Sequence, residues 1–373
     1  MARAPVLQET EAPPEADRLD GFPHPRVTAR LHSHAEAQDH FAKAFAEARV
    51  HHAWLITGRE GIGKATLAYR LARYVLAEPE QRGKGDDGVL SVPDDSIAAR
   101  QVKALSHPGL AVLRRPYDTR AKRLLTAITV DEVRRLKSFL SHSAGGWRVV
   151  IVDRADDLNL NAANALLKSL EEPPARVLFV LISSQPGRLL TTIRSRCRRL
   201  DLQPLNEADL RSAATAALSA SGQPLPPDAD WSRLAPLAQG SVRRLLTLAG
   251  ADGMKLSGRV SGLLSLLPKV DWPAVHALAD DVSGPGSEQR FEQAFDLMME
   301  AIARLIRARA LGADAGPDAQ LAQRVIPEHG LATWAELWET TLARKAETLA
   351  LNLDRKILIL ETVARLQAAS RGA

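Results

Sequence analysis

A glycine-rich stretch between a short apolar run and an amphipathic one is the feature that most constrains this fold. Residues 58–67 read GREGIGKATL. They follow AWLIT (53–57) and open ATLAYRLARYVLA (65–77), whose apolar residues recur at helical spacing. Strand, glycine loop and helix in this order is the context of a phosphate-binding loop, G-x-x-x-x-G-K-[ST]. The sequence therefore predicts an α/β domain built around such a loop.

The loop supplies part of the chemistry that phosphate binding requires. Glycines let successive backbone N–H groups face an anion, and a lysine brings a positive charge to the outer phosphates. The residues that match these roles are Gly58, Gly61, Gly63 and Lys64. The next position, where a hydroxyl would bind Mg²⁺, is Ala65, and Thr66 lies about 100° further around the helix. We therefore expect a loop that keeps its shape but lacks a metal ligand.

A second apolar run ends at an acidic residue of the type that such a site uses. In P-loop NTPases a strand-end aspartate holds Mg²⁺, and RVVIVD (148–153) places Asp153 there. A solvent-exposed carboxylate is the alternative interpretation of Asp153. The next residue, Arg154, cannot accept a proton from attacking water, and we do not expect Asp156 to replace the missing carboxylate. The defects at Ala65 and Arg154 indicate a site that at most binds ATP or ADP weakly and does not hydrolyse it.

Periodicity divides the chain into a part with strands and a part without them. Strand-like runs alternate with helices as far as residue 200, and RVLFVLISS (176–184) has the uninterrupted apolar character of a strand buried on both faces. This alternation predicts a parallel sheet with helices on both faces. Residues 1–24 are rich in Pro, Glu and Asp, so we expect a disordered tail there, and residues 78–98 are expected to form a surface insertion. From residue 256 onward every long segment is expected to be helical.

Composition and charge limit the function only loosely. The 373 residues are 45% hydrophobic and 25% charged, which is typical of a globular protein of roughly two or three domains. No apolar run is long enough to cross a membrane, and the N-terminal residues lack the apolar segment of a signal peptide. A net charge of +5 is compatible with nucleic-acid contact but small for this length. The single cysteine, Cys197, excludes an internal disulfide and a cysteine-cluster zinc site, so we expect a cytoplasmic protein.

An arginine-rich segment joins the last helix and the last strand of the expected sheet domain. TIRSRCRRL (192–200) places Arg196 between Ser195 and Cys197. An arginine in such a loop can reach the terminal phosphate bound by a neighbouring subunit and stabilise the transition state, an effect of about three to five orders of magnitude in rate. From composition alone, a solvent-exposed loop that aids solubility is the favoured alternative.

Several stretches together resemble bacterial DNA polymerase III clamp-loader subunits of the AAA+ family. The resemblance covers residues 25–250 closely, and it is most specific in the block that contains WRVVIVDRADD, ANALLKSLEEPP and IRSRC. Among these subunits the delta-prime family has a degenerate nucleotide site, and Ala65 and Arg154 place the chain with it. After the tail of 1–24, the resemblance implies a P-loop AAA+ domain over 25–202, a small helical lid over 203–252 and an all-α collar domain that oligomerises over 253–373.

The resemblance also implies roles for individual residues. Arg196 would act in trans as an arginine finger on the adjacent motor subunit. Arg243 in GSVRR falls at a second sensor arginine and Ser184 near a first sensor position, and without a competent site either can be vestigial. Many members carry a four-cysteine zinc module, but the corresponding insertion, 78–108, contains no cysteine, and His107 alone cannot hold a structural zinc. We therefore expect no metal and no required cofactor.

The function favoured by these residues is that of a non-hydrolysing structural subunit of the clamp loader. It would brace the ATPase motor subunits, supply Arg196 and help load the sliding clamp onto primed DNA during replication, as a component of the DNA-directed DNA polymerase (nucleotidyltransferase) holoenzyme. Its partners would be the motor subunits and the clamp-opening subunit in a hetero-oligomer, with the clamp and DNA reached through the complex and no membrane involved. Two alternatives stay open: an active ATPase motor subunit of the same complex, and a stand-alone P-loop protein with salt-dependent affinity for nucleic acid.

Overall fold

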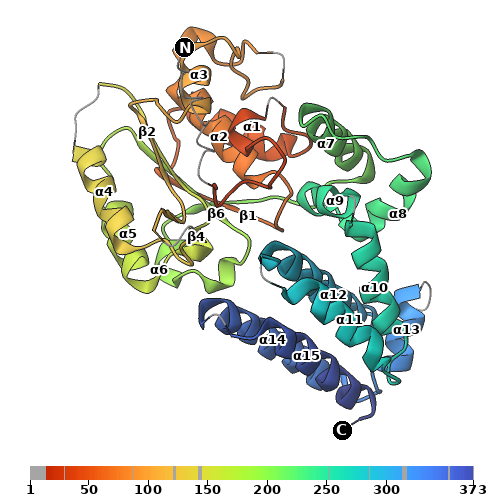
Figure 1. Ribbon diagram of the computed structural model, residues 1–373. Helices are drawn as coiled ribbons and strands as arrows, with labels where there is room; N and C mark the ends of the chain where they lie inside the picture. Colours follow the sequence, from red (N-terminus) through yellow and green to blue (C-terminus); the bar gives the residue numbers. More distant parts are fainter. Residues whose placement is uncertain are drawn as a thin grey trace, which may run out of the picture. The chain divides into compact units, whose positions relative to one another are not determined.

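The chain divides into two units of structure, residues 1–246 and 247–373, which are described in turn. The computed structural model describes residues 14–28, 30–85, 87–120, 123–141, 145–250, 252–284, 286–312, 317–351 and 353–372 (Figure 1). The predicted lid, 203–252, spans the division between the units. The expected domain boundaries therefore remain predictions.

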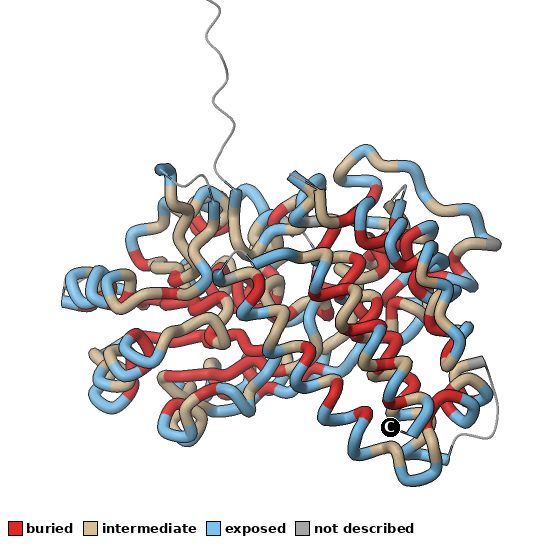
Figure 2. The backbone as a smooth tube through the Cα atoms, turned by 60° about the horizontal axis from the view of Figure 1, so that its bottom comes forward, coloured by how far each residue is buried: buried red, intermediate tan, exposed pale blue. Residues whose placement is uncertain are grey.

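A five-stranded parallel sheet organises the first unit. In sheet order its strands are β2 (Leu110–Leu113), β5 (Arg148–Val152), β6 (Val177–Ser183), β1 (Ala53–Thr57) and β7 (Arg198–Asp201). All four neighbouring pairs are parallel. Every residue of β1, β5 and β6 is buried, as their apolar composition predicts, and Figure 2 shows these strands as continuous buried runs. The parallel-sheet prediction is confirmed. A short antiparallel pair, β3 (Tyr117–Asp118) and β4 (Arg123–Leu124), lies outside this sheet.

Helices cover both faces of the sheet. They are α1 (Ala35–Ala46), α2 (Lys64–Leu76), α3 (Ile97–Lys103), α4 (Val130–Ser141), α5 (Leu160–Glu171) and α6 (Thr191–Arg194), with short 3-10 turns at Pro25–Val27, Pro79–Gln81, Ala155–Asp157 and Pro186–Arg188. Leu55 and Phe179 share one apolar core with α4 and α5. Trp54 points to the opposite face, where its ring lies 5.2 Å from that of Phe41 in α1. This alternation along β1 is the pattern of a strand buried between two layers of helices.

The N-terminal segment differs from the predicted disordered tail. Residues 1–13 lie outside the described part of the chain, whereas residues 14–24 pack against the domain. The side chain of Asp17 is 2% exposed and lies 2.8 Å from His24 Nε2 and 3.0 Å from Arg114 Nη1. Glu15 also pairs with Arg114, at 2.8 Å. The acidic residues that suggested disorder are therefore matched by basic residues of the domain, which sequence composition cannot show.

The cysteine-free insertion, 78–108, folds back onto α2 and contains the helix α3, which the sequence analysis did not predict. Arg82 holds its first part, because its guanidinium donates at 2.9–3.1 Å to carbonyl oxygens near the C-terminal end of α2, those of Tyr74, Val75 and Ala77. A cation at this end is favoured by the helix dipole. Asp87 adds an ion pair with Arg70 in the middle of α2. Guanidinium and carboxylate groups thus hold this segment against α2.

The helices that follow are α7 (Glu207–Ala220), α8 (Asp228–Ala238) and α9 (Val242–Ala249). The second unit contains α10 (Gly253–Ser265), α11 (Trp272–Ser283), α12 (Glu288–Ala310), α13 (Pro317–Val325), α14 (Leu331–Leu351) and α15 (Arg355–Ser370). These elements confirm the prediction of an all-helical region after the sheet. Among the described residues, none of the helices is long and apolar enough to cross a lipid bilayer.

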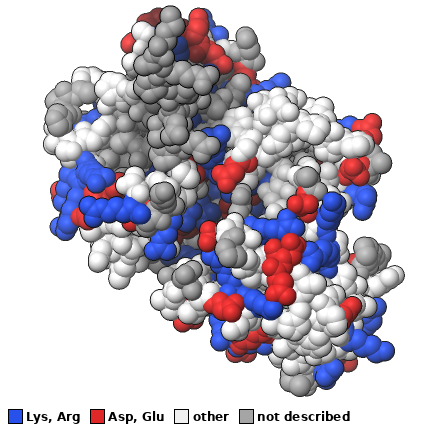
Figure 3. All heavy atoms as spheres, viewed as in Figure 1, with Lys and Arg blue, Asp and Glu red and all other residues white. Residues whose placement is uncertain are grey.

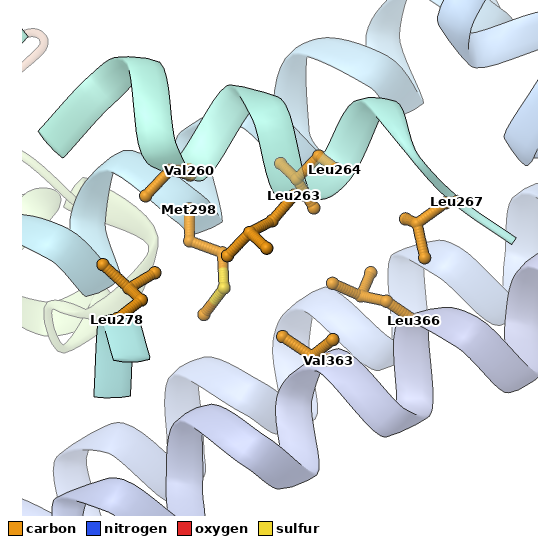
Figure 4. A pocket seen from close by; sticks show the side chains of 8 residues that line it. All are labelled: Val260, Leu263, Leu264, Leu267, Leu278, Met298, Val363 and Leu366. Carbon is orange, nitrogen blue, oxygen red and sulfur yellow. The ribbon is translucent and has the colours of Figure 1, made fainter. Parts of the chain in front are cut away.

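The second unit is built around one apolar core, in which Phe291, Phe295 and Trp334 are fully buried. The core contains a cavity of about 10 Å³, lined by Val260, Leu263, Leu264, Leu267, Leu278, Met298, Val363 and Leu366 (Figure 4). Seven of its eight lining residues lie on α10, α11, α12 and α15, Leu267 follows α10, and all eight side chains are apolar. A space of this size offers a water molecule no hydrogen-bond partners. We interpret it as a gap in packing and not as a ligand site.

Candidate functional site

The glycine loop lies between β1 and α2, in the strand–loop–helix order that the sequence predicts, and its phosphate-binding role remains a prediction. Its three glycines have positive φ, 139° at Gly58, 77° at Gly61 and 101° at Gly63, a region that side chains other than glycine rarely adopt. At Gly58 a Cβ atom would also lie 2.6 Å from the carbonyl oxygen of Leu202. The shape of the loop therefore requires these glycines, whether or not a ligand binds.

Lys64 points into the loop that precedes it. Its side chain is 5% exposed, and Nζ donates to the carbonyl oxygens of Gly58, at 2.8 Å, and of Arg59. Burial lowers the pKa of Lys64 to about 8, and the charges of Glu60 and Asp153 oppose this shift. An ammonium group has three donors, and two of them are used by the loop itself. In this structure Lys64 stabilises the loop through these hydrogen bonds, whereas in a working phosphate loop the lysine would contact a phosphate.

The first turn of α9 closes on the loop from the other side. Ser241 Oγ donates to the carbonyl oxygen of Glu60 at 2.8 Å, and the Val242 N–H donates to that of Gly61 at 2.9 Å. A Cβ atom at Gly61 would overlap Ser241 Oγ and lie 2.5 Å from Cβ of Arg243. The loop and the start of α9 are thus joined directly through main-chain carbonyl groups. No sequence motif indicated this contact, because its partners are about 180 residues apart.

Glu60 places a negative charge between two arginines of the candidate site. Its Oε1 lies 3.2 Å from Arg154 Nη1 and 3.5 Å from Arg243 Nε. Arg154 occupies the position where an active ATPase would need a carboxylate, and Arg243 is the predicted sensor arginine. The chain therefore supplies its own anion to both groups. Sequence analysis passed over Glu60 because it occupies a variable position of the motif, although an acid in an anion-binding loop is a usable signal.

Asp153 ends β5 in a buried position. Its side chain is 4% exposed, and its Oδ2 has no hydrogen-bond partner within the described structure. Burial raises the pKa of Asp153 to about 7, with a further contribution from the charge of Asp17, while Arg154 and Lys64 act in the opposite direction. The alternative interpretation of Asp153 as a solvent-exposed carboxylate is wrong. Its role as a metal-site aspartate remains a prediction.

Asp156 is engaged by the end of the neighbouring strand. Its carboxylate accepts hydrogen bonds from Ser183 Oγ at 2.6 Å and from the Ser184 N–H at 2.7 Å. These contacts fix the residues that follow β6, including the position expected for a first sensor. Both oxygens of this carboxylate are thus engaged by the residues at the end of β6. The expectation that Asp156 does not replace the missing glutamate is consistent with this arrangement.

Arg196 lies far from the loop of its own chain. It immediately precedes β7, whereas the loop follows β1, and the two strands run parallel with Trp54 opposite Arg198 and Thr57 opposite Asp201. Arg196 and the loop are therefore at opposite ends of the sheet, separated by at least the length of a strand, about 13 Å. Its side chain is 36% exposed. This placement prevents Arg196 from serving its own loop and leaves it accessible to another molecule.

Basic side chains gather over α4, at the left edge of the first unit in Figure 3. Two of them, Arg134 and Arg135, pair at 2.9 and 2.8 Å with acidic residues one turn earlier, Asp131 and Glu132. Such exposed pairs on one helix are common and neutralise part of the local charge. This surface by itself does not distinguish a nucleic-acid contact from a solvated helix.

The chain resembles known proteins over most of its length. A family model described as "DNA polymerase III, delta subunit" matches residues 33–206. The DNA polymerase III subunit delta' of Escherichia coli (strain K12) is 32% identical over 259 residues, which cover 69% of this chain and 71% of that protein. The chain belongs to the delta-prime family of DNA polymerase III subunits. A Pseudomonas aeruginosa member of this family is 41% identical over 148 residues, which span 39% of this chain and 41% of that relative.

This delta-prime family member is also similar to other DNA polymerase III subunits. The tau subunit of Salmonella typhimurium is 29% identical over 286 residues, covering 74% of this chain and 41% of that protein. Among solved structures, a gamma subunit-related protein of Thermotoga maritima has 18% sequence identity and a TM-score of 0.38, with 89% of this chain and 100% of that chain covered. The structural likeness is too distant to add to the argument, which rests on the sequence relatives.

Within the described ranges, no three His, Cys, Asp or Glu residues lie close enough together to hold a metal ion. The single cysteine, Cys197, is half-buried, and burial raises the pKa of its thiol to about 12. A thiol in that state is a poor metal ligand, because metals bind the thiolate. The expectations of no zinc and no required cofactor remain predictions.

Proposed function

We propose that this delta-prime family member is a non-hydrolysing structural subunit of the DNA polymerase III clamp loader. The observation that carries the proposal is the direct bonding of the phosphate loop to the first turn of α9 through Ser241 and Val242. An ATPase motor would need nucleotide to make and break contacts at this place. Here both bonds join groups of the chain itself, as expected of a subunit whose loop and α9 do not move with nucleotide.

The missing chemistry supports the same proposal. Ala65 offers no oxygen to Mg²⁺, and Arg154 offers no base to water. The remaining positive groups are also engaged, since Lys64 donates to its own loop and Arg154 pairs with Glu60. Any binding of ATP or ADP would have to replace these internal contacts, and we expect it to be weak.

The position of Arg196 supports a role in trans. It is accessible, it lies at the opposite end of the sheet from its own loop, and an arginine in such a place can stabilise charge on a phosphate bound by a neighbour. We assign it as an arginine finger toward an adjacent ATPase motor subunit. The further partners would be the clamp-opening subunit and, through the complex, the sliding clamp and primed DNA in the bacterial cytoplasm.

The proposal is tested first by ATP turnover of the purified chain with Mg²⁺ and primed DNA. We expect no turnover above background, and no change in the Lys64→Ala variant. Turnover that Lys64→Ala abolishes would contradict the proposal and restore the active-motor alternative. Tight, strongly salt-dependent DNA binding by the isolated chain would instead favour the stand-alone nucleic-acid-binding alternative.

The role of Arg196 needs the assembled complex. Arg196→Ala should reduce DNA-stimulated ATP hydrolysis at one motor site by about three orders of magnitude, while the variant still assembles. Arg194→Ala, two residues earlier on the same segment, is the matched control and should leave turnover unchanged. Wild-type turnover at every site in the Arg196→Ala complex would refute the trans role.

A further inference from the structure

An ion pair joins Arg196 to the C-terminal end of another helix. Its Nη2 lies 2.8 Å from Oε1 of Glu171, and both side chains are partly exposed, 36% for Arg196 and 46% for Glu171. The other terminal nitrogen, Nη1, donates to the carbonyl oxygen of Thr192 at 2.9 Å. The guanidinium is therefore held at two points that belong to two different elements, α5 and α6.

Local helix stability does not explain why a glutamate occupies this position. Glu171 is the last residue of α5, where the helix dipole disfavours a carboxylate and favours a cation. Two nearby arginines find partners closer in sequence, since Arg194 donates to Thr191 Oγ1 and Arg199 pairs with Asp201, whereas Arg198 contacts the distant His40. Arg196 instead takes its carboxylate from a residue 25 positions away. The C-terminal end of α5 thus carries a carboxylate that the helix dipole disfavours, and this carboxylate pairs with Arg196, the candidate arginine finger.

We infer that Glu171 is a positioning residue for Arg196, an inference that rests on the trans role proposed above. A guanidinium has five N–H donors, and the contacts with Glu171 and Thr192 account for two of them. The others stay available to a phosphate of the adjacent subunit. Arginine loses rotational freedom when it meets an anion, and a side chain already fixed in one orientation loses less of it. Glu171 therefore orders the finger before the neighbour's nucleotide arrives.

The test uses the clamp loader assembled with this chain, with kcat and KM for ATP measured in the presence of primed DNA. Glu171→Gln keeps the shape of the side chain and removes its charge. We expect kcat at the dependent site to fall about fivefold with KM unchanged, because a half-exposed ion pair contributes little more than this. Glu171→Asp should recover part of the loss. Glu172→Gln removes an exposed carboxylate from the same helix end and should behave as wild type.

Two further comparisons separate positioning from other effects. The melting temperatures of the isolated variants should be alike, and if Glu171→Gln does not fold, Glu171→Asp makes the same comparison alone. In an Arg196→Ala background, Glu171→Gln should cause no additional loss, since its effect passes through Arg196. An equal loss in that background overturns the inference, as does unchanged or faster turnover of Glu171→Gln while Arg196→Ala is impaired. If Arg196→Ala itself has no effect, the trans role fails and the positioning role fails with it.

Discussion

The phosphate loop and the Arg196 segment lie at opposite ends of one sheet, and their cations are used in opposite ways. Lys64 is buried and donates to its own loop, whereas Arg196 is partly exposed and held at the domain surface. A donor consumed by its own backbone stabilises the fold, while a donor left at the surface is available to another molecule. The two regions therefore differ in how far their positive groups are free to meet another molecule.

Each region also contains a glutamate, and the two glutamates act differently. Glu60 lies between Arg154 and Arg243 and neutralises groups that a nucleotide would otherwise meet. Glu171 contacts one terminal nitrogen of Arg196 and leaves most of its donors open. The same type of ion pair thus closes one site and orders the other. Changes at the loop should therefore act mainly on stability, and changes at Arg196 mainly on the activity of the complex.

The largest effect on stability is expected for Gly61→Ala. The new Cβ would overlap Ser241 Oγ and approach Arg243 at a residue whose φ is +77°, so the free energy of unfolding should fall by about 4 kcal/mol. Urea unfolding monitors the change. Gly88→Ala is the control, because Gly88 has a similar φ of +73° and no atom within 4 Å of its Cβ position, and about 1 kcal/mol is expected there. Equal losses would mean that the loop and α9 are not in tight contact.

Asp153→Asn should change how stability depends on pH. The pKa of Asp153 is raised to about 7 in the folded chain, so its protonated form is favoured by folding. That contribution is complete below the unfolded pKa and is lost as pH rises through about 7. Between pH 5 and 8 the wild type should therefore lose about 3 kcal/mol relative to the variant, measured by urea unfolding at each pH. Parallel pH profiles for the two proteins would show that the carboxylate is hydrated or paired in solution.

Ser241→Ala should have a smaller effect. It removes the hydrogen bond to the Glu60 carbonyl oxygen and the bond that Oγ accepts from the Arg244 N–H, so about 1 kcal/mol of stability is expected to be lost. Ser195→Ala is the matched control at the other end of the sheet, where an exposed hydroxyl donates at 3.2 Å to Thr192. A control effect as large as that of Ser241→Ala would remove the contrast between the two regions.

Arg196→Ala should have the smallest effect on stability. Its ion pair with Glu171 is half-exposed, so the free energy of unfolding is expected to change by about 0.5 kcal/mol or less. Thermal unfolding of the isolated variant, compared with ATP turnover of its complex, checks this separation. A destabilisation of several kcal/mol would instead make Arg196 a structural residue of the α5–α6 contact.

The sheet could be predicted from sequence because its signal is local. Uninterrupted apolar runs such as RVVIV and RVLFVLIS belong in strands buried on both faces, and the glycine loop fixed the order of strand and helix around Lys64. The loss of a metal ligand at Ala65 and of a base at Arg154 was likewise visible in single positions. Local patterns of this kind can be recognised without knowledge of the tertiary structure.

The contacts that close the loop could not be predicted in this way. Glu60 and Ser241 are far apart in sequence, and although Ser241 belongs to the GSVRR stretch, nothing in that stretch indicates a bond to Glu60. Residues 14–24 were predicted to be disordered from their composition, yet Asp17 is buried by pairing with Arg114. An acidic, proline-containing segment becomes ordered when the folded domain supplies matching cations, and periodicity carries no information about such a match. The same reason explains why the partner of Arg196 was missed.

The hydrogen bonds from Ser241 and Val242 to the loop bear on how this subunit would respond to the cell's supply of ATP. One bond of this joint is donated by a side chain and the other by the main chain, and main-chain carbonyl oxygens of the loop accept both. Under the proposed function, the geometry of this joint would not change with the ratio of ATP to ADP. Within an assembly whose ATPase subunits change conformation with that ratio, this subunit would then keep a constant geometry between its loop and α9.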